Sequence, residues 1–261
     1  MTFHTYHWSG CTLGDPDLES ARAALTPGQP DENAFLTLLR SSEVAGVGIA
    51  LDHYAYAEST SRFGGGNPYS AHAAEVLDRA RVILADPPSP SSETGAEKDG
   101  ADHASALVVM LNLAGPEDAD LIATALERAP TVSVEVAATM AASTVLSRST
   151  DLNQHLVDVL GDIIFDPSKS TDERLDALRA FNDATSPQAA EVVTRVLATD
   201  DIGLQMHAAL ILATHHLSTH RAVVEDVVAS WSEDAPPPAE FVLEALRADE
   251  DPAREQGSGD A

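Results

Sequence analysis

The fold is decided by residues 171–200, which read TDERLDALRAFNDATSPQAAEVVTRVLATD. In the first half, leucine, alanine and phenylalanine recur at the three-and-four spacing that places apolar side chains on one face of a helix. The Ser-Pro pair at 186–187 then opens a second apolar stripe, and proline is tolerated there because the first N–H of a helix has no intrahelical partner. The segment therefore predicts two antiparallel helices joined by a short turn.

The same pattern occurs four times between residues 102 and 231 and repeats every 32 to 37 residues. Each helix is apolar on one side only, so each pair can bury itself only against its neighbours, which is typical of an all-α solenoid of stacked helix pairs. The turns centre on Gly115-Pro116, Ser149-Thr150, Ser186-Pro187 and Ser218-Thr219. First helices are expected at about 102–114, 132–147, 171–184 and 202–216, and second helices at about 116–129, 151–165, 187–199 and 219–231.

Residues 171–200 resemble a HEAT-type repeat of the short variety that also occurs in bilin-lyase-like proteins. The resemblance extends less closely to 102–130 and 202–231. It implies a right-handed superhelix whose concave face is formed by the second helix of each pair, and a role as scaffold, adaptor or binding module. Two catalytic groups share this architecture, but the sequence has neither the His-Glu pairs of the di-iron hydroxylases nor the basic groove of the alkylpurine glycosylases.

Outside the four pairs the sequence is less regular. Residues 1–86 predict irregular helical hairpins, and the proline- and serine-rich residues 87–101 predict a flexible insertion. Residues 236–248 predict a capping helix and residues 249–261 a disordered acidic tail. We therefore expect a single α-solenoid domain over residues 1–248. Within its amino-terminal part, helices are expected at about 17–25, from Asp31, at 44–58 and at 70–85.

The charge balance narrows the classes of partner. The chain holds 42 acidic and 15 basic residues, a net charge of −27. Nucleic-acid binding draws most of its affinity from basic side chains that release counterions, so this balance argues against a DNA or RNA partner. The acidity either attracts a basic partner or serves solubility, and the sequence leaves both interpretations open.

Cysteine content and hydropathy bear on the compartment. Cys11 is the only cysteine, so no internal disulfide is possible, which suits a reducing compartment. No apolar run approaches the length that spans a bilayer, and the amino terminus lacks the pattern of a secretory signal. The expectation is a cytoplasmic protein with no membrane partner, and the oligomeric state is left open.

Acidic residues recur in the predicted second helices. If those helices line the concave face, they form a negatively charged trough suited to a basic protein, and a variant of this idea is an immunity or inhibitor protein that blocks a basic toxin. A solvated outer face explains the same residues without a partner. The candidate partner-binding residues are Asp118, Asp151, Asp158, Asp162 and Glu191.

A glycine-rich loop suggests a second hypothesis. Consecutive glycines let a backbone approach a ligand, and histidines and tyrosines on either side could form a polar pocket with His53, Glu58 and His72 as acid and base groups. A tight reversal between two helices explains the same glycines. The candidate ligand-binding residues are His53, Tyr54, Tyr56, Glu58, Arg62, Gly64, Gly65, Gly66, Asn67 and His72.

Other chemistry finds little support in the sequence. The histidines lack the paired spacing of a structural zinc site, and the Gly-x-Ser-x-Gly elbow of a serine hydrolase is absent. We therefore expect no metal, no cofactor and no catalytic residues. The favoured function is a protein-protein interaction scaffold, and the alternative is a small-molecule binding protein or enzyme that uses residues 52–72.

Overall fold

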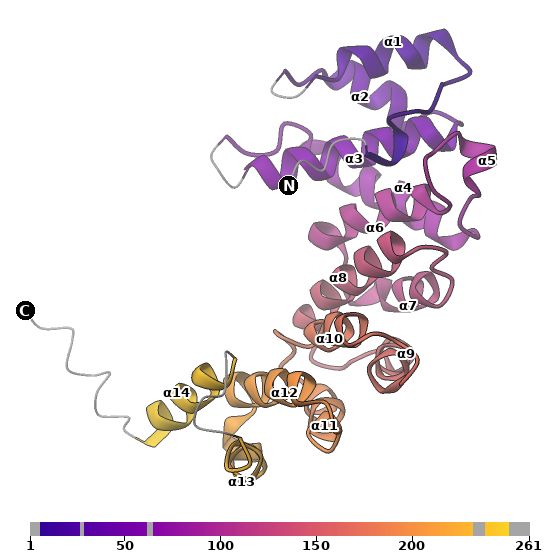
Figure 1. The fold of residues 1–261 in the computed structure, drawn as a ribbon. Coiled ribbons are helices and arrows are strands. Elements are labelled where there is room, and N and C mark those ends of the chain that lie inside the picture. The colour runs from indigo at the N-terminus through magenta and orange to yellow at the C-terminus, as the bar shows by residue number, and fades with distance from the viewer. Residues whose placement is uncertain (1–5, 27–28, 62–64, 232–237, 251–261) are drawn as a thin grey trace, which may run out of the picture. The chain divides into compact units, whose positions relative to one another are not determined.

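The computed structural model describes residues 6–26, 29–61, 65–231 and 238–250, and every regular element in these ranges is helical (Figure 1). The prediction of an all-α chain is thus confirmed. The chain divides into two compact units, which comprise residues 1–145 and 146–261 and are described separately. The single α-solenoid domain expected over residues 1–248 stays a prediction. The tail predicted at 249–261 lies, from residue 251 onward, outside the described residues.

Unit 1 is built from helices that pack in sequence order, α1 on α2 and α2 on α3, after which α3 and α4 both pack on α6. Aspartate side chains cap the first two helices, since Asp15 and Asp31 each accept a hydrogen bond from a first-turn N–H. The helices are α1 (Pro16–Ala24), α2 (Glu32–Leu39), α3 (Val44–Ser61), α4 (Ala73–Ala85), α5 (Ser91–Thr94), α6 (Ala101–Leu113), α7 (Ala119–Glu127) and most of α8 (Val132–Arg148), with 3-10 turns η1 (Tyr6–Trp8), η2 (Ser70–His72) and η3 (Pro116–Asp118).

Residues 87–101, predicted as a flexible insertion, make specific contacts within unit 1. The backbone N–H of Ser89 donates to both carboxylate oxygens of Asp102, at 3.2 and 3.1 Å. Further along, the N–H of Glu97 donates to the carbonyl of His7 at 3.2 Å. These contacts connect the segment to α6 on one side and to η1 on the other.

Unit 2 shows a regular contact pattern. Helix α9 packs against α10 and α11, and α10 packs against α12. Helix α12 also contacts α11, α13 and α14. Apolar side chains fill the spaces between these helices, among them the fully buried Leu160, Phe181 and Leu212. The helices are α9 (Gln154–Phe165), α10 (Thr171–Arg179), α11 (Pro187–Val196), α12 (Ile202–His215), α13 (Leu217–Val228) and α14 (Ala239–Glu250).

The helices of unit 2 follow the ranges expected from the sequence, with three differences. Helix α13 begins at Leu217, so the turn predicted at Ser218-Thr219 lies inside this helix, and the backbone instead leaves the helical conformation at His216. Helix α14 continues to Glu250, past the predicted end at 248. Helix α10 ends at Arg179, and residues 180–183 form turns where the prediction continued the helix to 184. Asn182 and Asp183 occupy this turn, and both residue types compete with helical hydrogen bonding through their short polar side chains. Within the described ranges, no helix is both long and apolar enough to cross a membrane.

Candidate functional site

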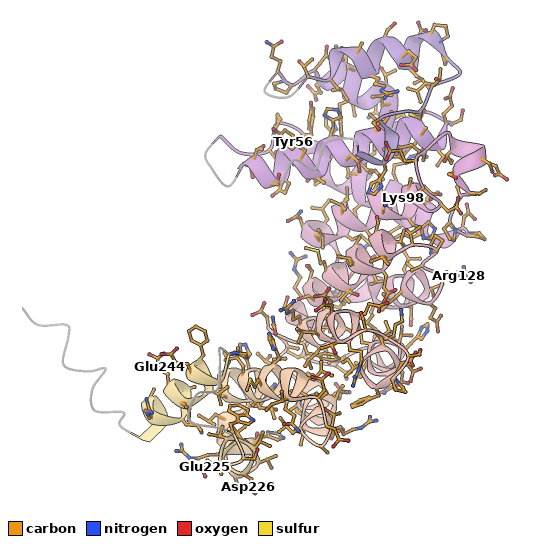
Figure 2. The ribbon with its side chains drawn as sticks, in the orientation of Figure 1. Tyr56, Lys98, Arg128, Glu225, Asp226 and Glu244 are labelled. Atoms are coloured by element: carbon orange, nitrogen blue, oxygen red, sulfur yellow. The ribbon has the colours of Figure 1, made fainter. Side chains whose placement is uncertain are left out.

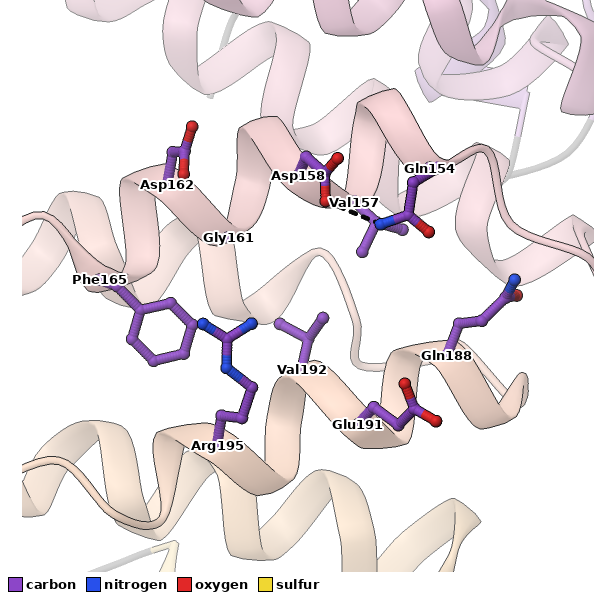
Figure 3. Close-up of a pocket in the computed structure, with 10 residues that line it drawn as sticks. All are labelled: Gln154, Val157, Asp158, Gly161, Asp162, Phe165, Gln188, Glu191, Val192 and Arg195. Atoms are coloured by element: carbon purple, nitrogen blue, oxygen red, sulfur yellow. Dashed lines mark hydrogen bonds between the residues drawn. The ribbon is translucent and has the colours of Figure 1, made fainter.

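A groove lies between α9 and α11 of unit 2 (Figure 3). Both helices begin at a side chain that caps them: Asn153 accepts from the N–H of Leu156, and Ser186 accepts from the N–H of Ala189. Both helices are amphipathic and bury one face in the core of the unit. Their remaining faces line a cavity of about 480 Å³.

The floor of this groove is apolar. Val157 and Val192 are buried there, and Gly161 also lines the cavity. A Cβ built on Gly161 would meet no atom within 4 Å, so the position opens into free space. Glycine inside a helix costs about 1 kcal/mol relative to alanine, and here the missing side chain keeps the groove open.

Carboxylates form the rim. Asp158 and Asp162 project from α9 and Glu191 projects from α11, and all three are exposed (Figure 3). Asp158 accepts a hydrogen bond from Gln154 Nε2 at 2.7 Å. Asp162 and Glu191 have no hydrogen-bond or ion-pair partner among the residues that the structure describes. The groove therefore presents unpaired negative charge over an apolar floor.

One cation lines the same groove. The guanidinium carbon of Arg195 lies 4.6 Å from the centre of the Phe165 ring, within the range of a cation–π contact (Figure 3). Arg195 is exposed at the carboxyl-terminal end of α11, and Phe165 is half-buried at the end of α9. Three carboxylates against one guanidinium leave the lining with a net negative charge.

Asp151 lies beside one end of this groove. It is exposed, and its Oδ1 is 3.5 Å from Nε2 of Gln188, which lines the cavity. The Oε1 of Gln188 accepts from the N–H of Leu152 at 3.0 Å, which fixes the glutamine between α11 and the segment before α9. Four of the five candidate partner-binding acids therefore lie in or beside one groove.

Asp118, the fifth candidate, has a different environment. It is only 3% exposed and lies in unit 1. Its carboxylate accepts from Arg81 Nε at 2.6 Å and from the N–H of Gly115 at 2.9 Å. Asp118 thus joins α4 to η3 and is not available at the surface. The acidic residue three positions after Gly115, at a helix start, was a sequence signal for this capping role.

Two further acids of the predicted second helices do not line the groove. Glu225 and Asp226 are exposed on α13 (Figure 2). Glu225 accepts from Arg221 Nε at 2.7 Å, an exposed pair within one helix. Such pairs contribute little to stability, about 0.3–0.5 kcal/mol.

The residues of the second hypothesis are dispersed. His53 and Tyr56 of α3 line a cavity of about 130 Å³ together with Tyr69. Tyr56 is labelled in Figure 2. Tyr54 is buried and does not line that cavity, and its burial raises the pKa of its hydroxyl. Tyr69 stacks on Phe35, with ring centres 4.2 Å apart, so this aromatic side chain has a packing role.

Glu58 and His72 do not line that small cavity. Glu58 Oε2 accepts from Asn67 Nδ2 at 2.9 Å, and the Asn67 Oδ1 accepts from the N–H of Tyr69, so the asparagine fixes the turn into η2. His72 Nε2 lies 2.7 Å from Glu32 Oε1 on α2. Glu58 and His72 thus make separate contacts, and neither lines the small cavity with His53.

The glycine-rich loop is described in part. Gly65 and Gly66 are exposed and have φ angles of 109° and 72°, a backbone conformation that favours glycine. This geometry accords with a tight reversal between α3 and η2. Arg62 and Gly64 lie outside the described residues.

Two further histidines have structural partners. His216 is buried, its Nε2 lies 3.0 Å from the carbonyl of Ala184, and burial lowers its pKa. His103 is also buried, with Nε2 3.0 Å from the carbonyl of Asp86 and a lowered pKa of the same origin. Across the part of the chain that the structure describes, no three His, Cys, Asp or Glu side chains lie together as metal ligands.

Sequence reasoning missed the groove residues that are not acidic. Phe165 and Arg195 lie 30 positions apart, at the ends of successive second helices, and only the packing of α9 on α11 brings them together. Gly161 did carry a signal, because a glycine inside an otherwise regular amphipathic helix calls for a reason.

The fold has a counterpart among solved structures. The crystal structure of an engineered protein from the Northeast Structural Genomics Consortium is similar, with a TM-score of 0.52 and 18% sequence identity, over 81% of this chain and 93% of that chain. No family model matches the sequence, and no curated protein does. A likeness at this identity concerns the fold alone, so function must be argued from the site.

Proposed function

We propose that this protein is an interaction scaffold of HEAT-like helix pairs that binds a basic protein partner in the groove between α9 and α11. The contact pattern of unit 2 supports the architectural part, since α9 on α11 and α10 on α12 is the order expected of stacked pairs. In such a solenoid the second helices would line the concave binding face.

The observation that carries the proposal is the unpaired negative charge of the groove. Asp162 and Glu191 lack partners among the described residues, while the apolar floor at Val157 and Val192 offers area that a partner can cover. Complementary charge steers encounter and selects partners, and burial of apolar area supplies affinity.

The charge of the whole chain acts in the same direction. A net charge of −27 raises the association rate with a cationic partner and repels nucleic acid. A basic toxin or nuclease has the required chemistry, so an immunity or inhibitor protein is a specific form of this function. The interaction should weaken steeply with added salt, since exposed charges are screened over about 10 Å at 0.1 M.

Affinity purification from the native cell tests the proposal. The wild-type chain should enrich one protein of high isoelectric point in stoichiometric amount, and the variant Asp158→Lys/Asp162→Lys should lose it. The variant Asp183→Lys/Asp200→Lys makes the same charge change at exposed positions of unit 2 outside the groove and should retain the partner. Retention by the groove variant would contradict the proposed surface.

A further inference from the structure

We propose that the groove recognises an arginine side chain of the partner, which stacks on Phe165 in the place that Arg195 occupies in the free chain. This inference rests on the proposed function and specifies the residue type that the groove selects. In the free chain, Arg195 takes the place of the partner's arginine. Its guanidinium carbon lies 4.6 Å from the centre of the Phe165 ring.

The contact of Arg195 with Phe165 is unexpected, because a carboxylate on the same helix is spaced to form an ion pair with Arg195. Glu191 lies four residues earlier on α11, an arrangement in which an acid and a following base favour a helical ion pair. Elsewhere in unit 2 the spacing of four residues does produce ion pairs, although with the base first, at Lys169–Glu173 and Arg221–Glu225. Arg195 makes no such pair within the described residues and lies over Phe165.

An Arg195 side chain displaced from the Phe165 ring has another favourable contact within reach. Because Arg195 is exposed and at a helix end, its side chain can leave the ring without disturbing the core. Glu191 is then in reach as an ion-pair partner one helical turn away. Asp158 and Asp162 remain to face the incoming cation, so the groove keeps two carboxylates for the partner.

The chemistry of the site favours arginine over lysine. A guanidinium is planar and weakly hydrated, so it stacks on an aromatic ring and donates hydrogen bonds from its edge at the same time, whereas an ammonium is compact and strongly hydrated. The carboxylates of Asp158, Asp162 and Glu191 line the same groove as Phe165 and add negative charge to it. The open space above Gly161 provides room for the chain that carries the arginine.

Three fluorescein-labelled nonapeptides of glycine and serine test this inference. They carry arginine, lysine or citrulline at the same two positions, and fluorescence polarisation measures their binding to the full chain at low salt. The arginine peptide should bind about three- to tenfold more tightly than the lysine peptide, as expected for a cation–π contact at a partly exposed ring. The citrulline peptide, which lacks charge, should bind at least tenfold more weakly than the arginine peptide.

Two variants test whether Arg195 and Phe165 cause the preference for arginine over lysine. Arg195→Gln removes the internal guanidinium, and we expect it to strengthen binding of both cationic peptides through charge and of the arginine peptide by a further few-fold through the vacated ring. Phe165→Leu should bring the arginine-to-lysine ratio to about one while binding persists through the carboxylates. Because Arg195 is exposed, the first variant remains informative even where Phe165→Leu impairs folding.

The outcomes separate this inference from the proposed function. An arginine-to-lysine ratio of one that Arg195→Gln does not change overturns arginine recognition. If Asp158→Lys/Asp162→Lys nevertheless abolishes binding of both peptides, the acidic groove as a partner site stands. Binding that survives this double reversal overturns both.

Discussion

The indole N–H of Trp8 donates a hydrogen bond to the hydroxyl of Ser105, 97 residues later, at 2.9 Å in the core of unit 1. Trp8 is fully buried, and Ser105 in turn hydrogen-bonds the buried carboxyl group of Asp52. This relationship joins η1 to both α6 and α3. It depends on Gly48, because a Cβ there would lie 2.3 Å from the Trp8 ring.

Gly48→Ala should therefore destabilise the protein even though alanine favours helix. The overlap with the indole forces Trp8 or α3 to shift, and overpacking of a core costs about 1–3 kcal/mol, more than the gain of about 1 kcal/mol in helix propensity. Urea denaturation followed by circular dichroism measures the change. A variant at least as stable as wild type would show that the ring repacks freely.

Gly161→Ala is the matched comparison and should have the opposite effect. The position is also inside a helix, but a Cβ there meets no atom within 4 Å, so the propensity gain of about 0.5–1 kcal/mol is realised. The same denaturation experiment applies. Binding of a partner that needs the open space should weaken in this variant while stability increases, and a loss of stability would disagree with the open groove.

Asp118→Asn should lower stability, because it removes charge from a carboxylate that bonds Arg81 and the N–H of Gly115. Arg81 is one-third exposed, which moderates the effect, and we expect a loss of about 1–3 kcal/mol. Asp162→Asn, at an exposed position without a partner among the described residues, should leave the free energy of unfolding within about 0.5 kcal/mol of wild type. Equal losses in the two variants would refute the distinction between a structural acid and a groove acid.

Asp52 should make stability depend on pH. Burial raises the pKa of its carboxyl group to about 7, so the folded chain retains a proton that the unfolded chain releases above about pH 4. The contribution of Asp52 is complete at low pH, declines as the pH rises from about 4 to 7, and is constant above that.

Asp52→Asn isolates this contribution. The free energy of unfolding of wild type minus that of the variant should decline between about pH 4.5 and 7 and then level off, because the variant lacks the titrating group. The subtraction cancels buried histidines such as His103 and His216, whose lowered pKa values give the opposite slope. Parallel curves for the two proteins would mean that Asp52 titrates normally.

The helices were predictable because each depends on local information. The apolar stripe of α9 and the Ser186-Pro187 start of α11 are visible within a window of a few residues, and both helices occur where expected. The acids of the groove were predictable for the same reason, since Asp158 and Asp162 follow from the solvent-facing side of an amphipathic helix.

What escaped prediction depends on contacts between distant residues. Nothing near Trp8 in the sequence identifies Ser105 as its partner, and the composition of residues 87–101 does not reveal the hydrogen bonds to Asp102 and His7. The contact of Arg195 with Phe165 likewise exists only once α9 and α11 pack together.

The burial of Trp8 also limits where the chain can be truncated. A truncation that removes η1 takes the indole out of the interior of unit 1, with the consequences of a large-to-small substitution in a core. A protease that removes a purification tag must therefore cut before Trp8. Loss of this side chain would leave a cavity beside α3 and α6.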